Sequence, residues 1–515
     1  MLDLTRRTFI QGAAATVLAS SIYRPANAAP KRGGHLRIGL AGGSSQDNVD
    51  PASVVYDTAY LTMATARNTL VNVEPNGDLS PGLAVKWEPS ADVTQWTFEI
   101  RQGVAFHSGK KLEAEDIIAS LNLHRGEDST SPAKSLMEPV TEIAADGGNK
   151  IVVKLSGPNV DFPAVLTDLR LVIVPAKDGK ADRQTLDGTG AYVIESFEPG
   201  QRIRFKRNPN YWDAENASFF DTAEVIVITD AAARMNALRS GQVDVINLAD
   251  LKTLNMLKRV PGIKVEDVPS GRFYIFGMMS DADPYKDKNV RQALKYAINR
   301  QEMVDKILLG HGTVGNDQPL DRAHKYFDKS LVQREYDPDK VRFHLKQAGL
   351  SELRVSLSVA EAAFPGAVAA GSLYAASAEQ AGVTIDVTRE PDDGYFENVW
   401  MKKPFTADYW TKLASADAQF TQGFFPGSPF NETHFDNARF NDLLVEARAT
   451  LDESKRSEMY NEMQRLVHEE SGAVIPMFAN YVWATKANVA HSAELSTKGD
   501  LDGFRCIERW WFENA

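Results

Sequence analysis

The sequence predicts a mixed α/β protein of two or more domains, and three observations lead to this fold class. At 515 residues the chain can bury more than one hydrophobic core. Residues 223–248, "AEVIVITD" followed by "AAARMNALRSGQVDVINL", read as strand, helix, strand, which favours a parallel sheet. Strand and helix patterns also alternate along the whole chain with no clear linker. The sequence therefore predicts lobes built from interleaved segments.

The order of the predicted elements follows from apolar spacing and turn residues. Alternating apolar and polar residues predict strands, and apolar residues three to four positions apart predict helices. The segments "KIVVKLSG" and "DLRLVIVPA" are predicted to be paired strands, and residues 190–208 a hairpin centred on Glu198-Pro199-Gly200. Further strands are predicted at 33–40 and 96–103, and helices at 60–73, 290–310, 337–348 and 439–470.

The N-terminus has the pattern of an export signal. The arginine pair Arg6-Arg7 precedes Phe9, a mildly apolar run of residues 10–22 and the small-x-small sequence "ANA". The run is too short to span a bilayer as a stable helix. We therefore expect a twin-arginine signal peptide, cleaved after Ala28, and a mature chain in the periplasm. The alternative is a cytosolic N-terminus that happens to be basic.

Composition excludes several classes of partner and cofactor. The net charge of −12 argues against nucleic acid or an anionic membrane face as the main partner. The single cysteine, Cys506, excludes an internal disulfide and a cysteine-based metal cluster. The nine histidines never pair at metal-ligand spacing. We therefore predict no metal site and no cofactor.

The stretch "RQGVAFHSGKKLEAEDI", residues 101–117, raises the question of a reactive histidine. His107 could act as a base if Glu113, Glu115 or Asp116 held its ring. The same residues also read as the end of a strand, a Ser-Gly turn and the acidic first turn of a helix. A single histidine at the end of a strand is more often structural, so we predict a structural role for His107.

Two further strings match catalytic or nucleotide-binding motifs without their context. "GHGTVG", residues 310–315, has the spacing of a dinucleotide fingerprint but follows a predicted helix, whereas that fingerprint needs a preceding strand. "SPAK", residues 131–134, matches Ser-x-x-Lys, but the accompanying Lys-Thr-Gly is absent. We therefore predict that the chain is not an enzyme. An envelope hydrolase using Ser131 and Lys134 remains a remote alternative.

Several blocks along the chain resemble a known family. Residues 76–121, "NGDLSPGLAVKWEPSADVTQWTFEIRQGVAFHSGKKLEAEDIIASL", strongly resemble the signature of family-five extracytoplasmic solute-binding proteins, the peptide, opine and nickel binders of ABC importers. The block at 188–213 resembles the Gly-Pro-Tyr block of that family, with Ala191 where proline is commoner. Similar blocks follow in the same order as in the family, at 234–245, 288–312 and 336–350.

The resemblance implies a two-lobed α/β clamp of the periplasmic-binding-protein type (class II), with an additional small domain in the first lobe. Such proteins close around a ligand by hinge motion and then dock on the membrane permease of the importer. We expect a monomer that binds a small molecule or peptide and interacts with permease subunits. The expected segments are 1–28 signal peptide, 29–72, 186–268 and 483–515 first lobe, 73–185 extra domain, and 269–482 second lobe.

The resemblance implies a peptide or a peptide-sized amphoteric solute such as an opine as ligand, with a nickel complex as a subordinate alternative. In the peptide binders an aspartate of an Ala-Asp-Tyr segment pairs with the ligand's amino terminus, and Ala407-Asp408-Tyr409 matches it. The residues after Tyr409 depart from the peptide-binder pattern. Aromatic residues around Asp408 could line a cleft, although such clusters are more often core. The ligand-binding candidates are Asp408, Tyr409, Trp410, Tyr56, Asn48, Tyr395 and Phe424.

Overall fold

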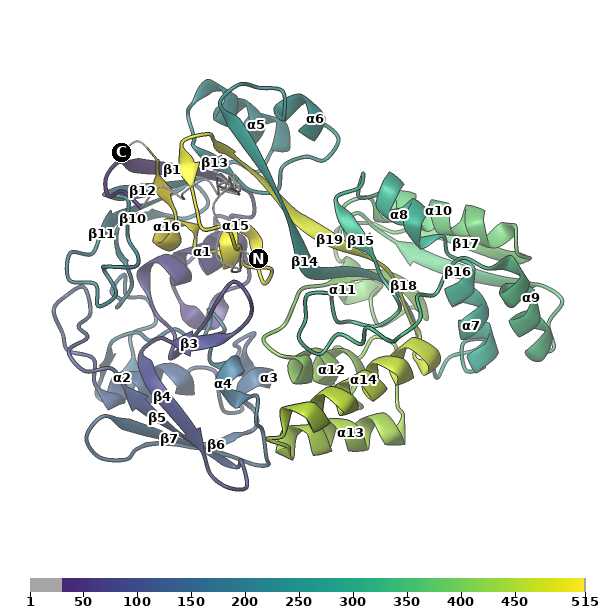
Figure 1. Cartoon of the computed structure of the whole chain (residues 1–515), viewed down its shortest axis with the longest axis horizontal. Coiled ribbons are helices and arrows are strands. Elements are labelled where there is room, and N and C mark those ends of the chain that lie inside the picture. Colours follow the sequence, from purple (N-terminus) through teal and green to yellow (C-terminus); the bar gives the residue numbers. More distant parts are fainter. Residues whose placement is uncertain (1–29, 514–515) are drawn as a thin grey trace, which may run out of the picture.

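Two α/β bodies joined by a pair of long strands make up the molecule (Figure 1). The computed structural model describes residues 30–513. The chain crosses from the first body to the second in β14 (Ile263–Met278) and returns in β19 (Ala473–Lys486). These strands pair antiparallel and lie in the middle of one mixed sheet, whose strand order is β10-β11-β12-β1-β13-β19-β14-β18-β16-β17. One sheet therefore runs through both bodies.

The first body contains the predicted strand–helix–strand unit. β1 (His35–Leu40) lies between β12 (Thr222–Val227) and β13 (Val245–Ile246) and is parallel to both. α5 (Ala231–Ser240) makes the crossover between β12 and β13, and Gly241 ends it in the left-handed conformation. This confirms the parallel arrangement that the spacing of apolar residues predicts.

The predicted hairpin forms the edge of the same sheet. β10 (Tyr192–Glu198) and β11 (Arg202–Arg207) pair antiparallel, with Glu198 opposite Arg202. Gly200 has φ of 66° in the turn, a conformation that glycine adopts readily. Apolar residues of these strands pack with Trp483 and Trp510 in the core of the first body.

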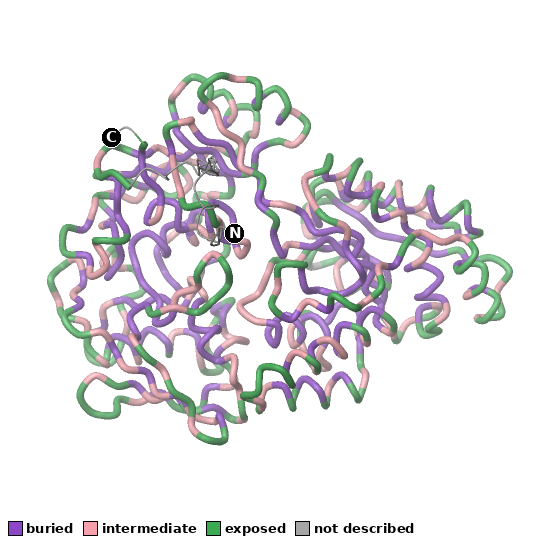
Figure 2. Tube along the Cα trace, viewed as in Figure 1, coloured by how far each residue is buried: buried purple, intermediate pink, exposed green. Residues whose placement is uncertain are grey.

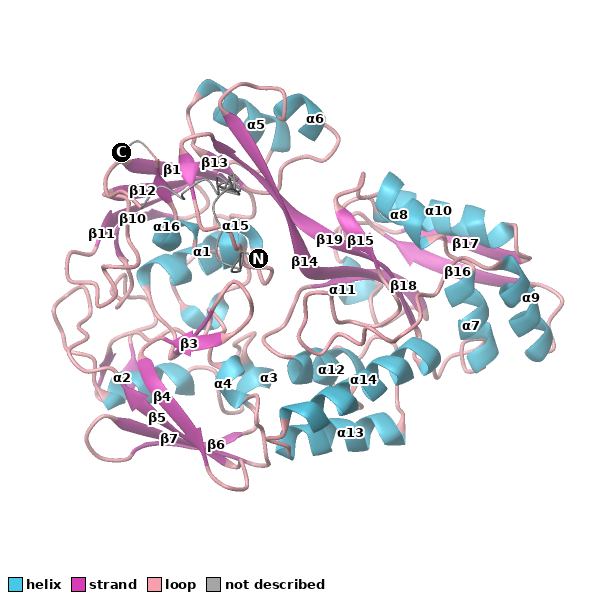
Figure 3. Ribbon diagram, in the orientation of Figure 1, coloured by secondary structure: helices cyan, strands magenta, loops and turns pink. Residues whose placement is uncertain are grey.

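A separate small sheet lies at the lower end of the first body (Figures 1 and 3). Its strand order is β4-β5-β7-β6 and every pair is antiparallel. The small sheet has its own hydrophobic core, to which α2 (Ala114–Asn122) contributes Ile117 and Leu121. Its strands are β4 (Ala84–Pro89), β5 (Gln95–Ile100), β6 (Val140–Ala145) and β7 (Lys150–Leu155).

The second body extends the main sheet with β18 (Phe405–Trp410), β16 (Leu353–Val359) and β17 (Val383–Arg389). Two layers of helices enclose these strands (Figure 3), and the interior between the layers is buried (Figure 2). One layer consists of α7 (Lys288–Tyr296), α8 (Arg300–Lys306), α9 (Pro338–Gln347) and α10 (Ala367–Glu379). The other consists of α12 (Ala416–Phe424), α13 (Ala438–Ala449) and α14 (Glu453–Glu470).

Short elements complete the described chain. The architecture is the predicted one, with two α/β bodies and an additional small sheet, while the exact segment boundaries stay predictions. No helix within residues 30–513 is long and apolar enough to cross a membrane. The short elements are η1 (Pro51–Ser53), α1 (Asp57–Ala66), β2 (Val71–Val73), β3 (Leu79–Pro81), α3 (Lys134–Met137), α4 (Phe162–Val165), β8 (Ala176–Lys177), β9 (Lys180–Ala181), α6 (Leu254–Leu257), β15 (Gly312–Val314), α11 (Tyr395–Asn398), β20 (Val489–Ala490), α15 (Asp500–Gly503), α16 (Cys506–Arg509) and β21 (Trp511–Phe512).

Two predicted helices are each divided in two. Residues 290–310 were expected to form one helix, but it is broken between α7 and α8, where the Asn299 side chain accepts a hydrogen bond from the Glu302 amide and starts a new helix. Residues 439–470 likewise form α13 and α14, and Asp452 caps the second of these. Polar capping residues inside an apolar repeat caused both errors.

Two other predicted elements differ from the structure. The helix expected at 60–73 ends at Ala66, and β2 follows it. Of the strand expected at 168–176, only Ala176 lies in a strand, the two-residue β8. The apolar residues of this segment are buried, but the amide of Ile173 bonds to the Asn68 carbonyl and that of Val174 to the Ser120 hydroxyl. The amides of Ile173 and Val174 are therefore satisfied outside any sheet.

Candidate functional site

His107 lies in a scaffold turn. The strand β5, the turn and helix α2 follow one another as predicted, and Glu113 and Asp116 form a capping box at the start of α2. His107 Nε2 lies 3.0 Å from the Gly190 carbonyl oxygen, and burial lowers the pKa of the ring. Asp116 instead pairs with Lys110, at 2.6 Å. The acids of this stretch therefore cap a helix, and the structural role predicted for His107 agrees with this geometry.

The Ser-x-x-Lys geometry of the hydrolase alternative is absent from the described residues. The Ser131 hydroxyl lies 2.6 Å from Nδ1 of the buried His124, whereas Lys134 Nζ donates to the Glu127 carbonyl across 2.9 Å. Burial lowers the pKa of His124 to about 4, so the ring is a neutral partner within a core. The "GHGTVG" string leads from α8 into β15, which is not the strand-to-helix turn of a dinucleotide site.

Strand β18 carries three of the candidate ligand-binding residues. Asp408 lies opposite Ile275 of β14, and Trp410 lies opposite Phe273, with which its ring stacks at 6.4 Å. Tyr409 is the alternate residue, and its side chain leaves the other face of the strand. The structure therefore brings Asp408 and Trp410 together and separates Tyr409 from them.

A second buried carboxyl, Glu432, lies beside Asp408. Both residues are 4% exposed. Trp410 Nε1 donates to one oxygen of Glu432 across 2.7 Å, and Trp400 Nε1 donates to the other across 3.2 Å. Glycine at position 277 of β14 leaves room for this carboxyl, because a Cβ there would lie 2.9 Å from Glu432 Oε2. We call Asp408 and Glu432 the acid pair.

The acid pair has no cationic partner within the described residues. Burial and the charge of Glu432 raise the pKa of Asp408 well above its usual value. Burial raises the pKa of Glu432 to about 7, against the opposing effect of the two indole donors. Two carboxyls in such a place cannot both be charged at low cost unless a cation joins them.

Three partly exposed aromatic side chains are linked to the acid pair through Trp400, which bonds Glu432. Phe396, Tyr409 and Phe430 are 38%, 43% and 39% exposed, which is unusual for rings of this size. Ring-to-ring contacts link them through Trp400: Phe396 lies 6.4 Å from Tyr409 and 6.1 Å from Trp400, and Trp400 lies 6.3 Å from Phe430. The sequence singled out the aromatics here, and the structure separates the exposed rings from the core rings.

Two candidates prove to be core residues. The Tyr395 ring is buried, and its hydroxyl lies 2.8 Å from the Ala407 carbonyl oxygen, which it bonds as donor. Phe424 is buried against Phe420 and Phe435 in the core below β14. The expectation that these two rings line a cleft is not supported by their burial, because both are enclosed by protein atoms.

Two candidates lie near the start of α1. The Asn48 side-chain oxygen accepts hydrogen bonds from the Asp50 amide at 2.9 Å and the Ser53 hydroxyl at 2.6 Å, so this side chain holds the loop. Tyr56 is exposed at the N-terminal end of α1. Of the two, Tyr56 has the side chain free to meet a solute.

Sequence reasoning missed a charged cluster where α1, β14 and α15 meet. Arg272 of β14 lies between the rings of Tyr274 and Tyr481, at 5.9 and 5.1 Å from their centroids. Burial raises the pKa of Asp57 to about 6 and that of Asp500 to about 7, and the charge of Arg272 opposes both shifts. The three charged residues are far apart in sequence, and no local pattern connects them.

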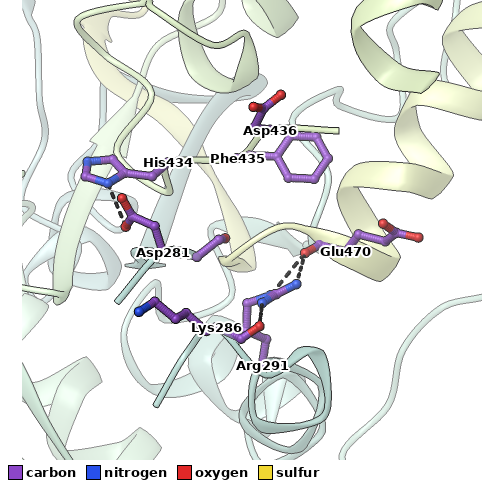
Figure 4. Close-up of a pocket in the computed structure, with 8 residues that line it drawn as sticks. Asp281, Lys286, Arg291, His434, Phe435, Asp436 and Glu470 are labelled. Atoms are coloured by element: carbon purple, nitrogen blue, oxygen red, sulfur yellow. Dashed lines mark hydrogen bonds and ion pairs between the residues drawn. The ribbon is translucent and has the colours of Figure 1, made fainter. Parts of the chain in front are cut away.

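A shallow polar hollow of about 270 Å³ lies elsewhere on the second body (Figure 4). Its charged groups already have protein partners: His434 Nδ1 lies 2.8 Å from Asp281, and Arg291 donates to the Glu470 carbonyl. Residues 30–513 contain no group of three or more His, Cys, Asp or Glu side chains placed to hold a metal ion. The acid pair therefore remains the candidate ligand site.

Comparison with known proteins agrees with this architecture. The family described as bacterial extracellular solute-binding proteins, family 5 Middle, matches residues 78–451. The dipeptide-binding protein of Pseudomonas aeruginosa is 23% identical over 491 residues, which cover 87% of this chain and 90% of that protein. The similarity therefore spans most of both chains.

Two solved structures share the fold. DppA from Helicobacter pylori, in complex with the peptide STSA, matches with a TM-score of 0.77 at 21% identity, over 94% of this chain and 99% of that one. AgaA from A. tumefacien R10, in complex with agropinic acid, matches with a TM-score of 0.76 at 21% identity, over 93% and 99%. The chain thus belongs to the family-5 extracellular solute-binding proteins of ABC importers, which are binding proteins and not enzymes.

Proposed function

We propose that this chain is the periplasmic binding component of an ABC importer and captures a peptide, or a peptide-sized amphoteric solute, by its cationic amine. The observation that carries the proposal is the acid pair, whose two buried carboxyls have no cationic partner within the described residues. A buried carboxylate is stable only when it is paired, so the missing cation is the group that a ligand would supply.

The partly exposed aromatic side chains that are linked to the acid pair through Trp400 support an amphoteric solute with apolar parts. Phe396, Tyr409 and Phe430 offer exposed ring area that an apolar ligand group would cover. Trp400 and Trp410 have their indole donors occupied by Glu432, and Trp410 stacks on Phe273, so a ligand would meet only the remaining ring surface of these partly buried side chains. A small inorganic cation alone would leave these rings exposed.

The relatives support the same class of ligand. One is a dipeptide-binding protein, one structure holds a peptide, and another holds agropinic acid, an opine. A peptide, which carries an amine and a carboxylate, is our first proposal, and an opine is the alternative. A nickel complex is less favoured, because the described residues offer no cluster of metal ligands.

Delivery requires that the two bodies close on the solute and then meet the permease. β14 and β19 are the natural hinge, because the chain crosses between the bodies there. We propose that the chain acts as a monomer and docks on the permease subunits of the importer. The export signal, with cleavage after Ala28, lies outside the described residues and stays part of the proposal.

Native mass spectrometry of the purified protein tests the ligand class, because a tight binder retains its solute. A co-purified peptide or opine is expected, followed by calorimetric titration of L-Ala-L-Phe and of its N-acetyl derivative. Binding of the dipeptide and not of the acetylated form would support the amine site. Equal binding of both would contradict it.

A further inference from the structure

Glu432 stands out because its carboxyl is fixed from two sides and yet has no counter-ion in the part of the chain that the structure describes. It lies in the loop between α12 and α13, while Asp408 belongs to β18. Two indole donors hold its two oxygens, and the glycine at position 277 provides the space in which it sits. A carboxylate can accept about four hydrogen bonds, so each oxygen keeps acceptor capacity. The Glu432 carboxylate is thus held in place with hydrogen-bond acceptor capacity to spare, unlike a side chain that only fills space in a core.

The charged and titratable groups around the acid pair do not neutralise it. Burial and the charges of both carboxyls raise the pKa of Tyr395, but its hydroxyl already donates a hydrogen bond to the Ala407 carbonyl. Glu390, whose charge also raises the pKa of Tyr395, pairs with Lys403 at 2.5 Å. Tyr409 adjoins Asp408, and His434 of the Glu432 loop pairs with Asp281. Among the described residues, the two carboxyls therefore have each other and the indoles as polar neighbours and no cation.

Two adjacent carboxyls in a buried place share a proton rather than ionise together. An ammonium group has three donors, so it can bind one oxygen of each carboxyl at the same time. Its arrival supplies the positive charge that the shared proton had supplied. The proton then leaves for the solvent, and the charge of the site is conserved.

We propose that Glu432 is a second ligand-binding carboxyl, so that the acid pair takes a primary ammonium group between its two members and releases one proton on binding. This inference rests on the proposed function and adds to it a chemical preference. An amine with three N–H donors is favoured over a tertiary amine, which has one donor and can satisfy only one carboxyl.

The test is calorimetric titration with L-Ala-L-Phe at pH 6.5 in buffers of different ionisation enthalpy, which counts the protons released. The wild type should release roughly one proton per ligand, and its affinity should fall by about tenfold when the pH drops from 6.5 to 5.5. Glu432→Gln should lose affinity at least about tenfold and release less than about half a proton. N,N-dimethyl-Ala-Phe should bind the wild type more weakly than Ala-Phe does. Its affinities for the wild type and for Glu432→Gln should also differ less than those of Ala-Phe.

Controls separate this inference from the proposed function. Glu462 of α14 forms an exposed pair with Arg439 of α13, and Glu462→Gln should behave like the wild type. Trp400→Phe keeps Glu432 and removes one donor, which should move the pH dependence of affinity to higher pH even if Glu432→Gln folds poorly. If Glu432→Gln kept the affinity and the proton release of the wild type while Asp408→Ala lost binding, the inference about Glu432 would be overturned and the proposed function would stand. A wild type that binds no amine-bearing probe would overturn both.

Discussion

Arg456 of α14 donates to the carboxylate of Asp161 across 2.5 Å, although the two residues are 295 positions apart and belong to different bodies. Asp161 starts α4 beside the small sheet, and the Tyr460 hydroxyl lies 3.3 Å from the same carboxylate oxygen. The amide of the preceding residue, Val160, donates to the Arg448 carbonyl across 2.9 Å. The two bodies are thus held together away from β14 and β19, which join them covalently (Figure 1).

Asp161→Ala should loosen this contact and lower stability. Arg456 is only 3% exposed, so the substitution leaves its buried charge with Glu453 alone, at 3.3 Å. We expect the free energy of unfolding to fall by about 3 kcal/mol, as for other broken buried pairs. The radius of gyration of the ligand-free protein, measured by small-angle X-ray scattering, should rise. Arg439→Ala, which breaks the exposed pair with Glu462, should change neither quantity; an equal effect of both variants would contradict the assignment.

Asp408→Ala should weaken binding of the ligand by at least tenfold without unfolding the protein. Truncating one member of a desolvated charge pair typically costs about 2–5 kcal/mol of binding free energy. Asp116→Ala is the matched control, since it removes an equally buried aspartate that caps α2 and pairs with Lys110. That variant should keep its affinity and lose stability. Calorimetric titration and thermal melting distinguish the two, and unaltered binding by Asp408→Ala would mean that the Ala-Asp-Tyr match is coincidental.

Glu432→Gln should alter the dependence of stability on pH. Because burial raises the pKa of Glu432 to about 7, the folded protein binds a proton there that the unfolded chain releases at lower pH. The wild type therefore loses stability as the pH rises from about 4.5 to about 7, by on the order of 3 kcal/mol from this group. In denaturant titrations the variant should exceed the wild type at pH 8 and lose the advantage at pH 5. A constant difference at both values would show that Glu432 titrates normally.

His107→Ala should leave ligand affinity within a few-fold of the wild type. The ring donates one hydrogen bond to the Gly190 carbonyl oxygen and, among the described residues, forms none with an acid of its own stretch. The expected effect is a modest fall in melting temperature, as for most scaffold substitutions. A hundredfold loss of affinity at an unchanged melting temperature would mean that the turn touches the ligand.

Replacing Arg6 and Arg7 by lysine should abolish export, because the arginine pair selects the route that carries folded proteins. Cell fractionation with an antibody to the mature chain measures this, and N-terminal sequencing should place the start of the exported protein at Ala29. The variant of Arg24 alone, outside the pair, should be exported normally. Export of the double variant at the wild-type level would show that the general secretory route suffices.

Local patterns in the sequence determined the elements whose partners lie nearby. The hairpin around Gly200 and the strand–turn–helix at His107 both follow from neighbouring residues, because turn chemistry and capping act over a few positions. The same reasoning failed at Asn299, where a cap hidden in an apolar repeat broke the expected helix. The family blocks added the two-lobed arrangement and pointed to Asp408.

Only the tertiary structure decided what surrounds Asp408. Trp410 lies two positions after Asp408 in β18, but Glu432, Trp400 and the glycine at position 277 come from other strands and loops. No spacing in the sequence connects these three with Asp408. Burial also separated Tyr395 and Phe424, which are enclosed, from Tyr409, which is exposed, although all three are aromatic residues of one region. The charge state of a carboxyl and the exposure of a ring depend on which distant atoms exclude water from them, and that is set by the packing of the whole chain.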